Sequence, residues 1–264
     1  MDSSNDDGYT PQINIRETVK KFFSKKVIDA CKTNENFNWK AESFMLVVDD
    51  YTMNLMNSFV PYPDLIDSGI IGVERLDLAK KQFPGMHAIY FISPTIESVD
   101  EMARDFPPVR KITNREDNSI APKDRLDGPT YSYVHIVFNN HCPPEVFAHL
   151  KTKKDLLPFI VNLSKVYLDF RCIDDSFITL DEPGLLRTLY GGLDPTGKKA
   201  AIEMIASRVT TFVSTRTAWR HIKIVYNESP SGPAQAIAKK VQANLERIQG
   251  EGKTYGITET NPIV

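Results

Sequence analysis

Two adjacent aspartates, Asp49 and Asp50, directly follow the apolar run FMLVV at residues 44–48. Carboxylates at the C-terminal end of a buried strand can act as nucleophiles or bind a magnesium ion. Adjacent residues of a strand point to opposite faces, however, so this pair is poorly arranged to share one metal ion. The segment YTMNLMNSF that follows is compatible with a helix, and an aspartate in front of it can cap the first turn. We therefore predict that Asp49 is a helix N-cap rather than a catalytic residue.

A second stretch could hold phosphate, because Gly192, Gly197 and Lys198 fit the spacing G-x-x-x-x-G-K of a phosphate-binding loop. That loop also needs a serine or threonine next, where this chain has Lys199. It needs a strand before it, whereas LLRTLYG has a helical pattern. We expect a helix end, a turn and a new helix here. A phosphate-handling α/β enzyme that uses Asp49 or the Gly192–Lys198 loop remains the alternative function.

The other reactive side chains form no catalytic or metal-binding pattern. The three cysteines are far apart and lack zinc-site spacing, so we expect buried, reduced thiols. The five histidines share no metal-ligand spacing, and no serine lies in a nucleophile-elbow pattern. The cysteines are Cys31, Cys142 and Cys172, and the histidines are His87, His135, His141, His149 and His221. We therefore expect no catalytic residue, no metal site and no cofactor, which favours a binding protein.

The composition is that of a soluble globular protein. The chain has 264 residues, of which 41% are hydrophobic and 25% charged, and its net charge is −2. A chain so nearly neutral has no overall positive field that would attract nucleic acid or anionic lipid. The first residues, MDSSNDDGY, are acidic and unlike a secretory signal, and no apolar run reaches the roughly 18 residues that span a bilayer. We expect a cytoplasmic protein that reaches membranes only through a partner.

Apolar patterning predicts alternating helices and strands over the first 170 residues. Helices are expected at residues 13–32, 51–59, 95–106 and 142–152. Strands are expected at residues 43–50, 70–76, 84–94, 131–138 and 165–170. The third helix should be capped by Thr95 and bury one face, composed of Ile96, Val99, Met102, Ala103 and Phe106. Alternation of this kind is typical of an α/β domain with a parallel sheet.

Three other segments follow a different pattern. Residues 1–12 are polar and predict a disordered tail, and the charged, non-periodic segment 107–130 predicts a flexible insertion. After residue 170 the sequence predicts a helix at 197–219, a strand at 221–227 and a helix at 232–249. These few elements cannot form a good core on their own. We therefore expect that they belong to a second α/β domain that is incomplete, and that the chain is a fragment of a longer protein.

Several stretches together resemble the SM family, the Sec/Munc-type syntaxin-binding proteins that regulate SNARE-mediated vesicle fusion. They are FMLVVDDYTMNLMNSF, PDLIDSGIIGVERLD, FPGMHAIYFISPTIESVDEM and YVHIVFNNHCPPEVFAHL. The resemblance implies that residues 13–150 form domain one, a flavodoxin-like five-stranded parallel sheet, and that residues 151–264 begin domain two. It implies a regulator of vesicle docking, exocytosis and protein transport that has no enzymatic activity. The expected partners are a syntaxin-type SNARE and the assembled SNARE complex, bound by a monomeric fragment.

The resemblance also assigns two binding surfaces, residue by residue. Asp49 and Glu74 match acidic positions on the face that holds a closed syntaxin, while Asn54 and Pro61 match contact positions that are basic in neuronal members. A second surface binds the N-terminal peptide of syntaxin. Its apolar pocket matches Phe147 and Leu163, and Lys165 stands where neuronal members have an acid.

Overall fold

The computed structural model describes most of the chain but not all of it. The predicted tail 1–12, most of the insertion 107–130 and Gly192 lie outside the described residues. The described residues are 14–34, 39–40, 42–107, 128–191, 194–215, 223–226 and 232–254.

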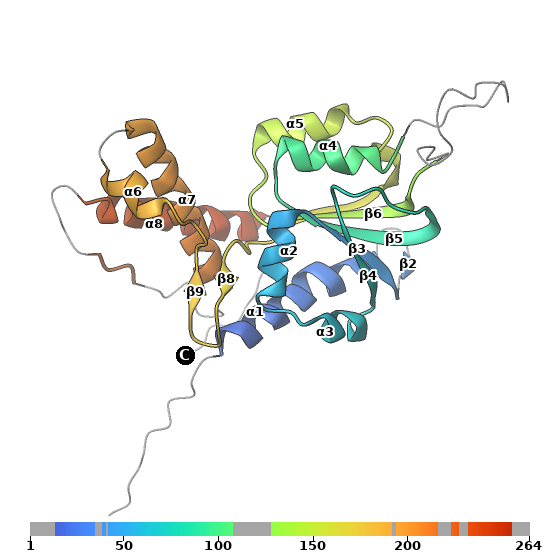
Figure 1. The fold of residues 1–264 in the computed structure, drawn as a ribbon, viewed down its shortest axis with the longest axis horizontal. Coiled ribbons are helices and arrows are strands. Elements are labelled where there is room, and N and C mark those ends of the chain that lie inside the picture. Colours follow the sequence, from blue (N-terminus) through green and yellow to red (C-terminus); the bar gives the residue numbers. More distant parts are fainter. Residues whose placement is uncertain are drawn as a thin grey trace, which may run out of the picture.

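A five-stranded parallel sheet forms the centre of the first part of the chain (Figure 1). Its order is β4-β3-β5-β6-β7, so the chain first builds one edge and then crosses over β3 to build the other. This is the doubly wound order of flavodoxin-like domains, and it confirms the predicted fold. The strands are β3 (Phe44–Val48), β4 (Ile70–Arg75), β5 (Phe83–Ile92), β6 (Tyr131–Phe138) and β7 (Ile160–Lys165).

Helices cover both faces of this sheet, which is why β3 is an unbroken apolar run. Phe44, Leu46 and Val48 point to one core cluster, and Met45 and Val47 point to the other. The first cluster is shared with α1 (Ile15–Phe23), α2 (Asp50–Asn57) and α3 (Tyr62–Asp67). The second is shared with α4 (Ile96–Arg104) and α5 (Pro144–Thr152), on the opposite face in Figure 1.

The fifth strand was predicted at 165–170, and that position is wrong. The strand is β7, which ends at Lys165, and the sheet therefore continues past residue 150. β7 is an edge strand whose side chains are only half-buried, so it lacks an apolar run. The next segment is buried but leaves the sheet: Val166, Leu168 and Phe170 pack into the α1-side core as extended chain.

Smaller elements also differ from the prediction. Ile96 was placed on the buried face of α4, but it directly follows the cap Thr95 and its side chain is 46% exposed. The extent of the first predicted helix, 13–32, is confirmed, but beyond Phe23 it continues as a π turn (Ser24–Ile28) and a 3₁₀ turn (Asp29–Cys31). The short helix α3 was not predicted, because Leu65 is its only buried residue and a pattern of six residues has too few repeats. A small antiparallel pair, β1 (Thr33–Asn34) and β2 (Trp39–Lys40), follows the first helix.

The chain beyond residue 170 is mainly helical in its described part. It begins with a hairpin of β8 (Arg171–Cys172) and β9 (Ile178–Thr179) and continues with α6 (Leu185–Tyr190), α7 (Pro195–Ser214) and α8 (Ala234–Thr254). The two long predicted helices are confirmed. The strand predicted at 221–227 is not found in its described residues, 223–226. We call the described residues up to 170 the sheet unit and those from 171 the helical unit.

Candidate functional site

Asp49 is the N-cap of α2, as predicted. Its Oδ1 accepts hydrogen bonds from the Thr52 backbone N–H at 2.7 Å and from the Thr52 hydroxyl at 2.8 Å. Its Oδ2 accepts from the Ser93 N–H at 2.6 Å and from the Ser98 hydroxyl at 3.2 Å. Both carboxylate oxygens therefore bind groups of the chain itself. The residue ties the start of α2 to the loop after β5 and to α4.

Glu74 belongs to a different network, although its strand is next to β3. It pairs in register with Val47, so it points to the α4 side of the sheet, where it accepts a hydrogen bond from the Tyr131 hydroxyl at 2.5 Å. Burial raises the pKa of Tyr131, which keeps this hydroxyl protonated and donating. Arg75, not Glu74, is the last residue of β4. The structure thus gives Asp49 and Glu74 separate partners within the chain.

A buried ion pair lies beside Glu74 in the same layer. The Lys80 ammonium is 3.0 Å from the Asp105 carboxylate, and the Tyr90 hydroxyl donates to that carboxylate at 2.8 Å. Burial raises the pKa of Asp105, while the ammonium opposes this shift. With both side chains almost fully buried, these contacts hold the end of α4 against the sheet rather than offering a surface to a ligand.

The two remaining residues of the proposed syntaxin face are accessible. Asn54 is exposed on α2, where its side-chain amide donates to the Asp50 carbonyl at 2.9 Å. Pro61 is exposed and precedes the first turn of α3. Because α2 and α3 pack against the same core cluster, both residues lie on the same side of the sheet.

The residues of the predicted peptide pocket lie on the other side of the sheet, on the edge strand β7 and on α5. Leu163 pairs in register with Ile136 of the α5-side core, and Lys165 pairs with Phe138 of the same core. Phe147 lies on α5 and is 39% exposed, and Leu163 is 40% exposed. The Lys151 ammonium lies 4.4 Å from the centroid of the Phe147 ring. Edge strand and helix therefore present half-exposed apolar side chains on one face.

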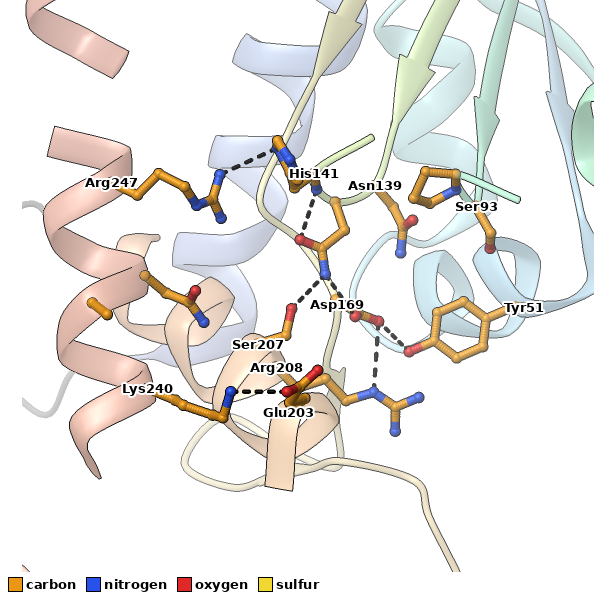
Figure 2. A pocket seen from close by; sticks show the side chains of 14 residues that line it. Tyr51, Ser93, Asn139, His141, Asp169, Glu203, Ser207, Arg208, Lys240 and Arg247 are labelled. Atoms are coloured by element: carbon orange, nitrogen blue, oxygen red, sulfur yellow. Dashed lines mark hydrogen bonds and ion pairs between the residues drawn. The ribbon is translucent and has the colours of Figure 1, made fainter. Parts of the chain in front are cut away.

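The structure also contains a cleft that the sequence did not reveal, with a volume of about 650 Å³ (Figure 2). One wall is the C-terminal edge of the sheet, and the other is formed by α7 and α8. The loops after β5 and β6 contribute Ser93, Asn139 and Asn140, and the helices contribute Arg208, Lys240 and Arg247. Ligands of open α/β sheets bind outside this same edge.

Asp169 lies at the base of the cleft and joins the two units. It accepts hydrogen bonds from the Tyr51 hydroxyl and, at 2.9 Å, from the Asn140 side chain, and the Arg208 Nε is 3.8 Å away. Its backbone N–H donates to the Thr211 hydroxyl of α7 at 3.2 Å. Burial and the neighbouring Asp169 raise the pKa of Tyr51, so this phenol stays protonated.

The phosphate-loop alternative fails on its structural context. Helix α6 ends at Tyr190, so no strand leads into the motif, and Lys198 lies in the first turn of α7 with its N–H bonded to the Asp194 carbonyl at 3.0 Å. The predicted helix end and new helix are confirmed for the described residues. Among these residues, no group of three or more acidic, histidine or cysteine side chains is placed to hold a metal ion. No helix in the described part is long and apolar enough to cross a bilayer.

The cleft was missed because tertiary packing assembles it from residues 51 to 247. One local signal was available. The polar run Asn139–His141 directly follows the apolar strand β6, which is where α/β sheets place ligand-binding loops. The helix side of the cleft has no comparable signal, since its basic residues are spaced like the solvated face of any amphipathic helix.

A family model described as the Sec1 family matches residues 44–262. Among curated proteins, the chain is 28% identical over 176 residues to "Protein transport Sec1a" of Arabidopsis thaliana, which covers 67% of the chain and 23% of that protein. It is 23% identical over 244 residues to "Protein transport protein sec1" of Dictyostelium discoideum, which covers 91% of the chain and 36% of that protein. The chain thus spans about a quarter to a third of the length of these relatives.

Solved structures show the same fold. The Unc18–syntaxin 1 complex from Monosiga brevicollis aligns with a TM-score of 0.68 at 22% identity, over 91% of this chain and 37% of the other. Sly1p in complex with an N-terminal peptide of Sed5p aligns with a TM-score of 0.70 at 21% identity, over 89% of this chain and 39% of Sly1p. The likeness covers both the sheet unit and the helical unit.

Proposed function

The chain belongs to the Sec1 family, and from this premise we propose that it binds a syntaxin-type SNARE and regulates vesicle docking and membrane fusion. The observation that carries the proposal is the family match over residues 44–262. The fold shared with proteins solved together with syntaxin 1 or with a Sed5p peptide supports it. The protein would act in the cytoplasm and reach membranes through its SNARE partner.

One proposed binding surface is the face of α2 and α3, for a closed syntaxin. Asn54 and Pro61 are exposed there and can touch a partner directly. Asp49 and Glu74 already accept hydrogen bonds from Ser93 and Tyr131, respectively. They would contribute by fixing the start of α2 and the end of β4, and not by forming strong ion pairs with the partner.

The second proposed surface is the edge of β7 beside α5, for the N-terminal peptide of a syntaxin. Half-exposed apolar side chains on a rigid strand and helix suit a short peptide that buries one or two apolar residues. Lys165 adds a positive charge at the end of this strand, which favours an acidic residue in the peptide. That preference would distinguish this chain from relatives that have an acid at this position.

We further propose that the chain acts by binding a partner and catalyses no reaction. We also propose that domain two begins after the sheet. The carboxylate best placed for chemistry, Asp49, is used to cap α2 and to bind Ser93 and Ser98. Burying an apolar side chain contributes about 1.5–3 kcal/mol, so two such anchors contribute about 3–6 kcal/mol, and the remaining free energy of a micromolar complex, about 8 kcal/mol in all, must come from other contacts of the peptide.

A calorimetric titration with N-terminal peptides of candidate syntaxins tests the peptide surface. We expect Phe147→Asp and Leu163→Asp to weaken binding by about tenfold or more, or ~1.4 kcal/mol. The matched control is Leu186→Asp, which introduces the same charge at an exposed leucine of α6 in the helical unit. Equal binding by all three variants, or no binding of any peptide by the parent chain, would contradict the proposed surface.

A further inference from the structure

Basic side chains from three elements meet at one end of the cleft. The Arg247 Nη1 of α8 is 3.2 Å from the His141 Nδ1, and the Lys165 ammonium at the end of β7 is 3.4 Å from the same nitrogen. Figure 2 shows Arg247 reaching from α8 toward His141 across the cleft. We call Lys165, His141 and Arg247 the cationic cluster.

The geometry of the cationic cluster fixes the role of its imidazole. Two positively charged groups approach the same Nδ1, so this nitrogen is the acceptor and the ring is neutral. Tyr167 also takes part: its ring centroid is 5.7 Å from the Lys165 ammonium and 5.9 Å from the Arg247 guanidinium, and its hydroxyl is 3.3 Å from Arg247. A neutral imidazole and an aromatic ring thus hold two like charges close together.

An anion with more than one charge placed beside His141 would be attracted by both the Lys165 ammonium and the Arg247 guanidinium. The planar guanidinium of Arg247 matches two phosphate oxygens at once, and the ammonium of Lys165 adds a point charge. The Ser207 hydroxyl, which accepts from the Asn140 amide, can donate to the rest of a phosphorylated molecule, and the Lys240 ammonium, paired with Glu203 at 2.9 Å, also lines the cleft.

The position and size of the cleft agree with such a ligand. His141 and Lys165 lie at the C-terminal ends of β6 and β7, the edge at which α/β sheets bind their ligands. The cleft volume of about 650 Å³ is within the range of small-molecule sites. His141 is exposed and Arg247 is half-buried, and both line the cleft, while the half-buried Lys165 contacts His141 from outside it.

We propose that the cationic cluster binds a phosphate group, carried either by a small soluble molecule such as an inositol phosphate or by a lipid headgroup. His141 and Arg247 of this site face the cleft beside α8 and not the exposed faces of α2 and α5. Lys165 also belongs to the proposed peptide surface, so Arg247 is the residue that separates the two sites.

The test is calorimetric titration of the 264-residue chain with inorganic phosphate, inorganic pyrophosphate and inositol trisphosphate. We expect Arg247→Ala to weaken binding of the phosphorylated probes by about tenfold or more, and Arg247→Lys to fall between, because it keeps the charge but loses the planar fork. The control is Lys239→Ala, which removes a charge from the exposed side of the same helix. A melting curve for each variant confirms that it is folded.

Equal losses of probe affinity in Arg247→Ala and Lys239→Ala would show that only the overall charge matters, which would overturn the proposal. A parent chain that binds none of the probes would overturn it as well. Sedimentation with phosphatidylcholine vesicles, with and without phosphatidylinositol bisphosphate, separates the two sources of phosphate. Recovery with the bisphosphate vesicles, lost in Arg247→Ala, assigns the site to a lipid headgroup. Binding of soluble probes without vesicle recovery assigns it to a soluble ligand. Syntaxin peptides are absent from these titrations, so failure here leaves the proposed SNARE binding intact.

Discussion

The sheet unit and the helical unit differ in how much apolar surface each buries internally. In the sheet unit, two large clusters of buried apolar residues fill both faces of the sheet. In the helical unit, the two clusters contain three buried residues each. Apolar burial is strong but non-directional, whereas hydrogen bonds fix geometry. The sheet unit therefore carries its own stability, and the helical unit is joined to it by the polar contacts of Asp169 and by apolar contacts such as that of Phe212 with Phe170, whose ring centroids are 5.3 Å apart.

The strongest test of this contrast compares one large side chain from each unit. Phe91 is fully buried and contacts Phe23 edge-to-face at 5.2 Å, so we expect Phe91→Ala to lower the free energy of unfolding by about 3–5 kcal/mol. Ile205→Ala in α7 should cost about 2 kcal/mol, because its cluster is small and open to relaxation. Urea denaturation measures both, and equal losses would remove the distinction.

Acid should act on the sheet unit through a histidine pair. His135 is fully buried with its Nε2 3.1 Å from the Nδ1 of His87, and burial lowers its pKa from 6.5 to about 3. The pKa of His87 is lowered by burial as well. The unfolded chain therefore binds protons below pH 6.5 that the folded chain does not. Stability is fully present above this pH and falls as the pH is lowered toward 3.

At pH 5 the expected loss from His135 is about 2 kcal/mol, from the pKa difference at 1.36 kcal/mol per unit. Urea denaturation at pH 7 and pH 5 measures it. His135→Leu, which cannot titrate, should lose less stability over this interval. The described part of the helical unit contains no histidine, so an equally steep loss in that variant would show that other groups carry the acid sensitivity.

Removing the joint between the units should have a smaller, local effect. Asp169→Ala leaves the Tyr51 hydroxyl without its acceptor, removes one of the two acceptors of the Asn140 amide and takes the carboxylate away from Arg208, at a cost of about 1–3 kcal/mol. Amide hydrogen exchange should rise in α7 and stay unchanged in β3 and β5. Asp181→Ala is the control, since its ion pair with Arg171 is more exposed and is worth about 0–1 kcal/mol. Uniform exchange changes over the whole chain would argue against a local joint.

The smallest effect is expected at the residue that first suggested chemistry. Asp49→Ala removes the cap of α2 and the acceptor of the Ser93 N–H, and should cost about 1–2 kcal/mol, while Asp49→Asn keeps one oxygen for the cap and loses the acceptor for Ser93 and Ser98. Binding of a syntaxin N-terminal peptide should not change in either variant, because that surface lies on the opposite face of the sheet. A melting curve and a peptide titration measure the two quantities, and a loss of affinity without a loss of stability would give Asp49 a direct role.

Sequence patterning predicts the centre of the sheet well and its edge poorly, for a physical reason. β3 and the second half of β5 are buried on both faces, so both appear in the sequence as unbroken apolar runs. The edge strand β7, IVNLSK, is half-exposed and resembles a loop, whereas VYLDF next to it is buried and resembles a strand without joining the sheet. Burial and strand pairing are separate properties, and patterning detects only burial.

The same limit applies to the candidate sites. The cap at Asp49 is predictable, because its partner Thr52 is three residues away. The cleft is not predictable, because Asp169, Asn140 and Arg208 meet only after both units have folded. The binding positions Asn54, Pro61 and Phe147 came from resemblance to a family, and their exposure agrees with a surface role without defining a partner.

The strand order has a consequence for how the protein is made. β5 joins the sheet beside β3, and from β6 onward each strand joins beside the strand synthesised before it, so the sheet then grows in one direction as the chain leaves the ribosome. Until β7 emerges, the newest strand is an open edge with unpaired backbone groups, which is the state most prone to association with other chains. The edge strand closes this growth with a less apolar sequence that includes Asn162, Ser164 and Lys165. Its polar side chains protect the last open edge of the nascent protein.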